Sequence, residues 1–497
     1  MLGSDQSIAS FKRPQCNLDI LCNVMRFLRW KKDLLAMMQT CQSLYRAGVP
    51  QLLRMIEVYL LERTTKGPPN LMISFCLFIT PDLHLRGSLV HQLKLPEPWD
   101  PERYADIIKT FASVVRHLSN LKLFEIDGCE SWLHLDDSLL PALSSLQNLK
   151  EVRITSRAKQ YPNSYNMVQF LQENYSPVEF LNVSLSYDGD RRNPFQLFRN
   201  FSSTLQILDF NTATFSVVDV VYPRLKTFLL HLLTIDEIVI EPFLVSLPNL
   251  TSLSLGSILG SANGQDINEL RRDNIHAQRA RKWSQLDIIC GEVMALYVLG
   301  LQCHVHHLME RGSPLRESSL WMWETVVEDT QPKAITLRVG FCNFDVDDVP
   351  LVVPPRARAN VTHLQLNLDF NYAEVDIDEA MESTFVLLRS LPLVFLRLGL
   401  EWTDFDRQDE VDTDPVPIYI NKIDANPEAF VHRIADCVSS LKTFLLTTFV
   451  LDSSGTSVWE VSSVDGKVKV EGPRRNHWQV MRSEGMIPLN WFDLQRE

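Results

Sequence analysis

A short hydrophobic phrase, apolar-x-x-apolar-x-apolar, recurs along most of the chain. Most successive copies lie about 20–30 residues apart, and a regular period of this size indicates stacked supersecondary units. The last two apolar residues of each copy alternate with polar ones, as in a short strand that is buried on one face. The copies begin at Val90, Leu121, Leu149, Val178, Leu205, Leu225, Leu250, Ala334, Val361, Leu393 and Leu441.

Segments with helical hydrophobic periodicity precede several of these strands, at residues 104–118, 167–174, 378–389 and 427–438. Helix, short loop and strand in repeated order predict an α/β solenoid, with parallel strands on the concave face and helices outside. The phrase and its period resemble leucine-rich repeats. We therefore expect an irregular leucine-rich-repeat solenoid as the body of the protein.

Strand alternation also predicts which side chains point away from the core. If Val152 and Ile154 face the core, Arg153 lies on the concave face. The same rule selects as substrate-binding residues Arg153, Asn182, Asp209, Leu229, Ser254, Arg338, Gln365 and Arg397. The mixed charge of these residues favours a protein or peptide substrate over a small molecule.

Changes in composition suggest how the chain is divided. Residues 257–282 are polar and charged and contain glycine and asparagine, which predicts an inserted loop between two blocks of repeats. Valines 461, 464, 468 and 470 alternate with polar residues, which predicts strands that cap the open end. The expected segments are a disordered tail (1–13), a helical module (14–62), repeats (63–256), the inserted loop (257–282), repeats (283–450) and a cap (451–497).

The module at residues 14–62 shows the apolar spacing of short helices. Leu18, Leu21, Val24 and Leu28 form one stripe, and Asp33 is a suitable N-cap for a second helix. Gly48 and Pro50 are expected to separate this helix from a third one that begins near Leu52. Three short helices bury little apolar surface by themselves, so such a module completes its core against a neighbour or a partner.

Two stretches of this module, Leu18-Asp-Ile-Leu-Cys-Asn-Val-Met-Arg-Phe-Leu and Asp33-Leu-Leu-Ala-Met-Met-Gln-Thr-Cys41, resemble an F-box. The family's opening Leu-Pro is Cys16-Asn17 here. Phrases at residues 283–308 (Trp283-Ser-Gln-Leu-Asp and Val305-His-His-Leu308 among them) resemble the expanded F-box-like families of mushroom-forming fungi. The alternative interpretation of the module is a generic helical hairpin that caps the first repeat.

The resemblance implies a non-catalytic, substrate-recognition subunit of a cullin–RING (SCF-type) ubiquitin ligase. Its module would bind the Skp-type adaptor and its repeats an unknown protein substrate. A scaffold without a ligase is the second hypothesis, and an enzyme or nucleic-acid binder is the third. The residues implied in adaptor binding, some of which must instead form the module's own core, are Leu18, Leu21, Val24, Phe27, Leu28, Leu34 and Leu35.

Composition narrows the other possibilities. The net charge is −13, which argues against a protein that coats nucleic acid. The longest apolar run is far shorter than the about 20 residues of a membrane span, and residues 1–13 show no signal-peptide pattern. The nine cysteines form no Cys-x-x-Cys pair, as expected for reduced thiols in a cytoplasmic or nuclear protein.

Candidate chemistry is sparse, and we expect no catalytic residue, cofactor or metal site. Cys290, Cys303, His304, His306 and His307 lack the paired spacing of zinc ligands. The acidic run 404–414 lacks the glycine of a calcium loop. A basic cluster at Arg271, Arg272, Arg279, Arg281 and Lys282 is interpreted as a solvated loop, with a nuclear-import or nucleic-acid patch as the alternative.

Overall fold

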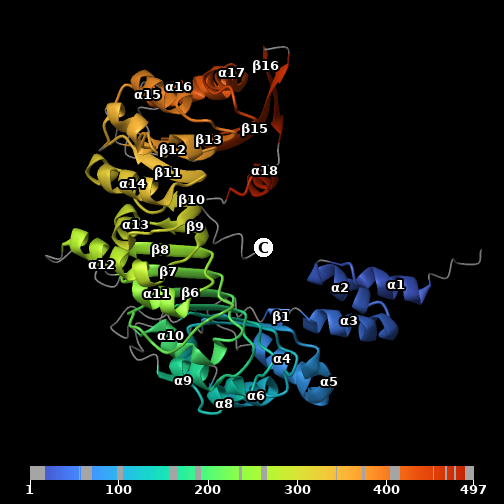
Figure 1. The fold of residues 1–497 in the computed structure, drawn as a ribbon. Coiled ribbons are helices and arrows are strands. Elements are labelled where there is room, and N and C mark those ends of the chain that lie inside the picture. The colour runs from blue at the N-terminus through green and yellow to red at the C-terminus, as the bar shows by residue number, and fades with distance from the viewer. Residues whose placement is uncertain are drawn as a thin grey trace, which may run out of the picture. The chain divides into compact units, whose positions relative to one another are not determined.

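A computed structural model shows the fold (Figure 1). It divides into two compact units, Met1–Asp188 and Gly189–Glu497. The structure describes residues 17–28, 30–54, 56–57, 70–97, 105–155, 165–184, 192–233, 238–258, 266–342, 344–371, 375–402, 415–450, 453–464, 467–474 and 477–486. The expected tail at residues 1–13 and the acidic run 404–414 lie outside these ranges.

Unit 1 begins with three helices, as the sequence predicts. They are α1 (Leu18–Met25), α2 (Lys31–Met38) and α3 (Gln42–Arg54). Asn17 caps α1, since its side-chain oxygen accepts a 2.9 Å hydrogen bond from the backbone nitrogen of Asp19. The helices share a small core of Met25, Leu34, Met38 and Leu44.

The expected position of the third helix is wrong. Gly48 and Pro50 lie inside α3, which ends at Arg54, and Ile56–Glu57 form the short strand β1. A Cβ at Gly48 would overlap the side chains of Met38 and Met25. The glycine is therefore required for close packing between the helices, and it does not end a helix.

The remainder of unit 1 alternates helices with parallel strands. Middle anchors of the repeat phrase align across the strands, with Leu93, Phe124, Val152 and Leu181 in one buried row. The strands are β2 (Gln92–Leu95), β3 (Leu123–Asp127), β4 (Glu151–Thr155) and β5 (Phe180–Ser184). The helices are α4 (Asn70–Ile79), α5 (Leu83–Ser88), α6 (Ala105–Val115), α7 (Cys129–Leu133), α8 (Leu139–Ser144) and α9 (Tyr165–Glu173), with a 3₁₀ turn at Thr80–Asp82.

Unit 2 continues the same plan with parallel pairing from β6 to β14. Its parallel strands are β6 (Ile207–Thr212), β7 (Thr227–Leu233), β8 (Ser252–Ile258), β9 (Gln285–Gly291), β10 (His304–Glu310), β11 (Ala334–Gly340), β12 (His363–Asp369), β13 (Phe395–Trp402) and β14 (Thr443–Val450). The connecting helices are α10 (Pro194–Leu197), α11 (Ile240–Ser246), α12 (Ile267–Ala280), α13 (Val293–Leu299), α14 (Glu317–Thr330), α15 (Ile377–Arg389), α16 (Pro415–Ala425) and α17 (Pro427–Cys437). Among the residues of unit 2 that the structure describes, 3₁₀ segments lie at Arg199–Phe201, Val346–Val352 and Arg358–Asn360.

All the apolar anchors of the phrase that the sequence identifies are buried, from Val90 in unit 1 to Leu446 in unit 2. Parallel strands that pair in sequence order and alternate with helices form a repeat fold of the leucine-rich-repeat type. We call the sheet face opposite the helices, which the sequence predicts to be concave, the inner face.

The inserted loop expected at residues 257–282 is wrong for its described part. Helix α12 occupies Ile267–Ala280, and β8 pairs directly with β9, so the repeats run across the expected break. The buried side of α12 is polar. The Asn274 side chain accepts from the nitrogen of Ile240 and donates to the carbonyls of Ile238 and Val298, at 2.7–2.9 Å. A helix that buries amides has no apolar stripe, so its composition resembles that of a loop.

The phrase at Ala334 is placed two residues too late. Strand pairing aligns Ile335, and not Leu337, with the middle anchor Leu364. A shift of two residues keeps every side chain on its predicted face. Arg338 therefore does lie on the inner face, but Thr336 takes the place next to Gln365.

The expected cap is present and more extensive than predicted. Strand β15 (Ser453–Val464) pairs antiparallel with β14, and β16 (Lys467–Arg474) pairs antiparallel with β15. The sequence did not predict the helix that follows, α18 (His477–Ser483). Figure 1 shows α18 on the inner-face side of unit 2, opposite α14 and α15.

Candidate interaction surfaces

The helical module separates the residues implied in adaptor binding into core and surface. Leu34 belongs to the core, and Leu21 and Leu28 pack against it, so their role is at least partly structural. Leu18, Val24, Phe27 and Leu35 are exposed, with Phe27 82% exposed. When a partner covers an apolar side chain that is exposed on a folded module, the removal of apolar surface from water lowers the free energy of the complex.

Three further apolar side chains of the module are exposed, and the sequence did not single them out as a surface. They are Ile20 beside Asp19 on α1, Trp30 at the N-cap of α2 and Tyr45 on α3. Trp30 is 69% exposed. Aromatic side chains are enriched in interface cores, and Trp30 would have been a candidate by residue type alone.

The inner face of unit 1 carries a row of polar side chains. Strand pairing aligns Lys94, Glu125, Arg153 and Asn182 across β2 to β5. Lys94 and Glu125 form a 3.5 Å ion pair, and each side chain is 28% exposed. Arg153 donates a 2.7 Å hydrogen bond to Glu151 and lies over the ring of Phe180 at 5.2 Å. Arg153 and Asn182 are therefore half-buried, on the predicted face, and within reach of a partner.

The inner face of unit 2 is more covered than the sequence predicts. One row aligns Asp209, Leu229, Ser254, Cys290, Met309, Thr336, Gln365, Arg397, Leu445 and Val458. Asp209, Leu229, Ser254 and Gln365 are buried, so their expected exposure is wrong. Alternation determines the face on which a side chain lies but not what covers that face. For example, the Oδ1 atom of Asp209 lies 2.6 Å from the Nε2 atom of His231 on the next strand.

A charged network lies one step along from this row. Arg338 forms ion pairs with Asp369 at 3.0 Å and Glu401 at 2.8 Å. Burial, and to a lesser extent the nearby carboxylate of Glu292, raises the pKa of Glu310 to about 8, against the opposing effect of Arg338. Arg338 is half-exposed, and its charge is neutralised by Asp369 and Glu401. Its ion pairs therefore stabilise the fold, whether or not it also contacts a ligand.

Helix α18 covers part of the row. Met481 and Met486 lie in one apolar cluster with Ala334, Phe395, Leu445 and Val458. The Nη1 atom of Arg397 contacts the sulfur of Met481 at 3.4 Å. Arg397 is therefore half-buried although its strand register is as predicted, because a segment from the end of the chain contacts it.

The candidate zinc ligands have ordinary structural roles. His304 and His306 are exposed, whereas His307 is buried and contacts the hydroxyl of Thr336 at 2.9 Å. Burial lowers the pKa of His307 to about 3, and it raises the pKa of the Cys290 and Cys303 thiols to about 11. Within the described ranges, no group of three or more His, Cys, Asp or Glu residues is arranged to hold a metal ion.

The residues of the basic cluster do not form one continuous surface, because Arg271 is buried and the others are exposed. Arg271 is buried on α12, where it donates to the carbonyl of Tyr297, pairs with Asp329 and lies 4.5 Å over the Tyr297 ring. The other four cations are exposed on α12 and just after it. Its most buried member therefore stabilises the contact between α12, α13 and α14.

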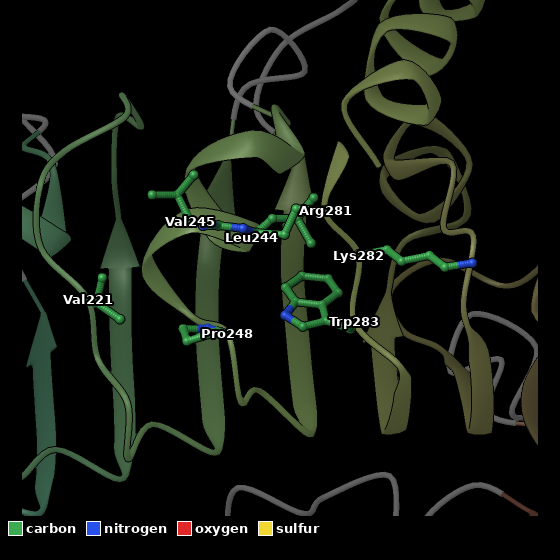
Figure 2. Close-up of a pocket in the computed structure, with 7 residues that line it drawn as sticks. All are labelled: Val221, Leu244, Val245, Pro248, Arg281, Lys282 and Trp283. Atoms are coloured by element: carbon green, nitrogen blue, oxygen red, sulfur yellow. The ribbon is translucent and has the colours of Figure 1, made fainter. Parts of the chain in front are cut away.

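An open hollow of about 340 Å³ lies beside the end of this cluster (Figure 2). Val221, Leu244, Val245, Pro248 and Trp283 supply apolar lining, and Arg281 and Lys282 supply two exposed cations. The indole nitrogen of Trp283 donates a 2.8 Å bond to the carbonyl of Leu247, which holds the ring in place. The lining residues include no carboxylate, histidine, cysteine or hydroxyl side chain.

None of the helices in the described residues is long and apolar enough to cross a lipid bilayer.

Comparisons with known proteins give weak similarities. No protein-family model matches the sequence, and no curated protein matches it. The leucine-rich repeat-containing protein LegL7 from Legionella pneumophila is similar over 72% of this chain and 90% of its own, with 13% identity and a TM-score of 0.33. A chain in the yeast Rad7–Elc1 complex is similar over 77% of this chain and 87% of its own, with 13% identity and a TM-score of 0.29. At these scores neither structure assigns a function to this chain.

Proposed function

We propose that the chain is the substrate-recognition subunit of a cullin–RING ubiquitin ligase. The exposed apolar side chains of the three-helix module would bind a Skp-type adaptor, and the repeats would bind a protein substrate. The chain would supply no chemistry of its own. It would instead raise the effective concentration of substrate lysines near the ubiquitin carrier.

The exposure of Phe27 is the observation that carries this proposal. The module already has a core, so Phe27, Val24 and Leu18 are not needed to hold its helices together. These residues belong to the stretch that resembles an F-box. Complete burial of a phenylalanine that is 82% exposed removes on the order of 150 Å² from water, which corresponds to about 4 kcal/mol as an upper value.

The inner face of unit 1 is the best-supported substrate surface. Its row of Lys94, Glu125 and Arg153 offers both charge signs and remains partly exposed. Such a surface favours a protein or peptide that carries complementary charges. The corresponding positions Asp209, Leu229 and Ser254 in unit 2 are buried.

Co-purification tests the adaptor half of the proposal. The full chain is co-expressed with a Skp-type adaptor, and the recovered adaptor is compared between wild type and a Val24→Asp plus Phe27→Asp variant. We expect the wild type to retain the adaptor, and we expect the amount of adaptor recovered with the variant to be at least about tenfold lower. Leu85→Asp is the matched control, because Leu85 is exposed on α5 outside the module and should bind as wild type.

Circular dichroism checks that the variants remain folded, and Leu34→Asp shows what a change in the module core does. The proposal fails if wild type recovers no adaptor, or if the folded double variant recovers as much as wild type.

A protein-interaction scaffold without a ligase is the second candidate. Asn17 occupies the position next to the start of α1 where the F-box family has its Leu-Pro, and its side chain caps the helix. Loss of that apolar pair removes part of the surface that F-boxes present to the adaptor. Failure to recover the adaptor, with retention of other proteins on the repeats, would favour this candidate.

A further inference from the structure

The C-terminal helix α18 lies over the inner face of unit 2 and reaches across several strands. Met481 and Met486 are buried in a cluster that extends from Ala334 on β11 to Val458 on β15. Beyond the last parallel strand, β14, the sheet continues with the antiparallel strands β15 and β16. Helix α18 packs on the face of the sheet and not along its edge at β16, so the need to cap that edge does not explain its position.

The polar groups under and beside α18 are poorly matched by it. The guanidinium of Arg397 donates to the thioether of Met481 at 3.4 Å, and sulfur is a weak acceptor. On the same face, Gln365 lies next to Arg397 and is completely buried. Neither its Oε1 nor its Nε2 has a hydrogen-bond partner. A buried polar group without a partner costs about 1–3 kcal/mol.

One contact indicates the chemistry that this face accepts. Glu484, one residue beyond the end of α18, places a carboxylate oxygen 3.4 Å from the Nε2 atom of His363. Arg397, Gln365 and His363 can all donate to a carboxylate, whereas α18 brings only Glu484, which contacts His363. The apolar residues Phe395, Leu445 and Val458 beside them suit the apolar side of a short helix.

We propose that α18 is a displaceable internal ligand that covers a peptide-recognition surface on β11–β15. The external ligand is a short amphipathic helix that places apolar side chains on Phe395 and Leu445 and a carboxylate on Arg397. This inference rests on the proposed role of the inner face in substrate recognition, but it does not depend on adaptor binding by the module.

Displacement is tested with the full chain and a labelled peptide of residues 475–487. Met481→Lys places a second cation beside Arg397 in the apolar cluster and should release α18. Ser483→Lys introduces the same residue on the exposed side of the helix and is the matched control. By fluorescence anisotropy we expect the peptide to bind Met481→Lys at least about tenfold more tightly than wild type or Ser483→Lys, since the apparent affinity scales with the open fraction.

A second peptide tests the ligand class. A peptide with Met481→Glu places a carboxylate opposite Arg397 and should bind the opened chain more tightly than the native peptide. That gain should disappear when the opened chain also carries Arg397→Met. If the acidic peptide binds no more tightly, the proposed ligand class is wrong.

Hydrogen exchange of the wild-type chain makes the test independent of any variant. The amides of α18 should exchange through local opening, much faster than those of β12–β14. The proposal is overturned if α18 is as protected as these strands, if Met481→Lys unfolds the unit, or if the opened and folded chain does not bind the peptide. Adaptor recovery should be unchanged by Met481→Lys, so this inference and the proposed function can fail separately.

Discussion

Asn274→Ala is expected to destabilise unit 2 by about 3–5 kcal/mol. The side chain is 3% exposed and makes three hydrogen bonds to the backbone of neighbouring repeats, with Ile238, Ile240 and Val298. Alanine leaves one N–H and two carbonyls buried without this partner, at about 1–3 kcal/mol for each group. The carbonyls can accept elsewhere, which places the expected total below the simple sum of three groups.

Calorimetry of the full chain measures this effect. A loss of about 3–5 kcal/mol should lower the melting temperature of unit 2 by roughly 5–15 °C. Asp273→Ala is the control, because Asp273 is the exposed neighbour on the same helix and its loss should change stability by less than about 0.5 kcal/mol. A fall of less than 1 kcal/mol for Asn274→Ala would show that α12 does not connect these repeats, and would refute the account of its polar buried side.

Two further changes test the charged network on the inner face. Glu310→Gln should stabilise the chain by roughly 3–5 kcal/mol at pH 8.5 and have little effect at pH 4.5, as measured by urea unfolding. The pKa of Glu310 is raised to about 8 in the fold, so the wild type loses stability as pH rises from about 4.5 to 8, and glutamine removes that loss. Arg338→Met should cost about 2–4 kcal/mol at pH 7, because it leaves the carboxylates of Asp369 and Glu401 close together without their cation. The cost should shrink at pH 4.5, because burial raises the pKa of Glu401 and its protonation relieves the repulsion, and an equal cost at both pH values would contradict this reasoning.

The sequence predicted the repeat body well because strands and helices have fixed periods. The alternation of Val152 and Ile154 with Arg153 places two residues in the core and one on the opposite face, as the structure shows. The same rule tolerated the error at β11, because a shift of two residues preserves the face. It could not identify α12, whose buried residues Asn274 and Gln278 bond to backbone groups that are distant in sequence.

The candidate surfaces depended more strongly on tertiary structure. In the module, neighbouring apolar residues of one helix divide between core and surface, and only packing shows that Leu34 is buried while Leu35 is exposed. Glycine is typical of a helix end, but in the fold Gly48 lies inside a helix, where the absence of a Cβ leaves room for the side chains of Met25 and Met38.

By itself the sequence determined the repeat period, the strands that the hydrophobic phrase marks, and the face on which their side chains lie, because these follow from backbone geometry within one repeat. The tertiary structure alone decided which of these side chains remain accessible. Gln365 is on the predicted face yet buried, Arg397 beside it is half-buried, and Met481, which contacts Arg397, is more than 80 residues away in the chain. Coverage by a distant segment depends on packing in three dimensions, and no local pattern of residues encodes it.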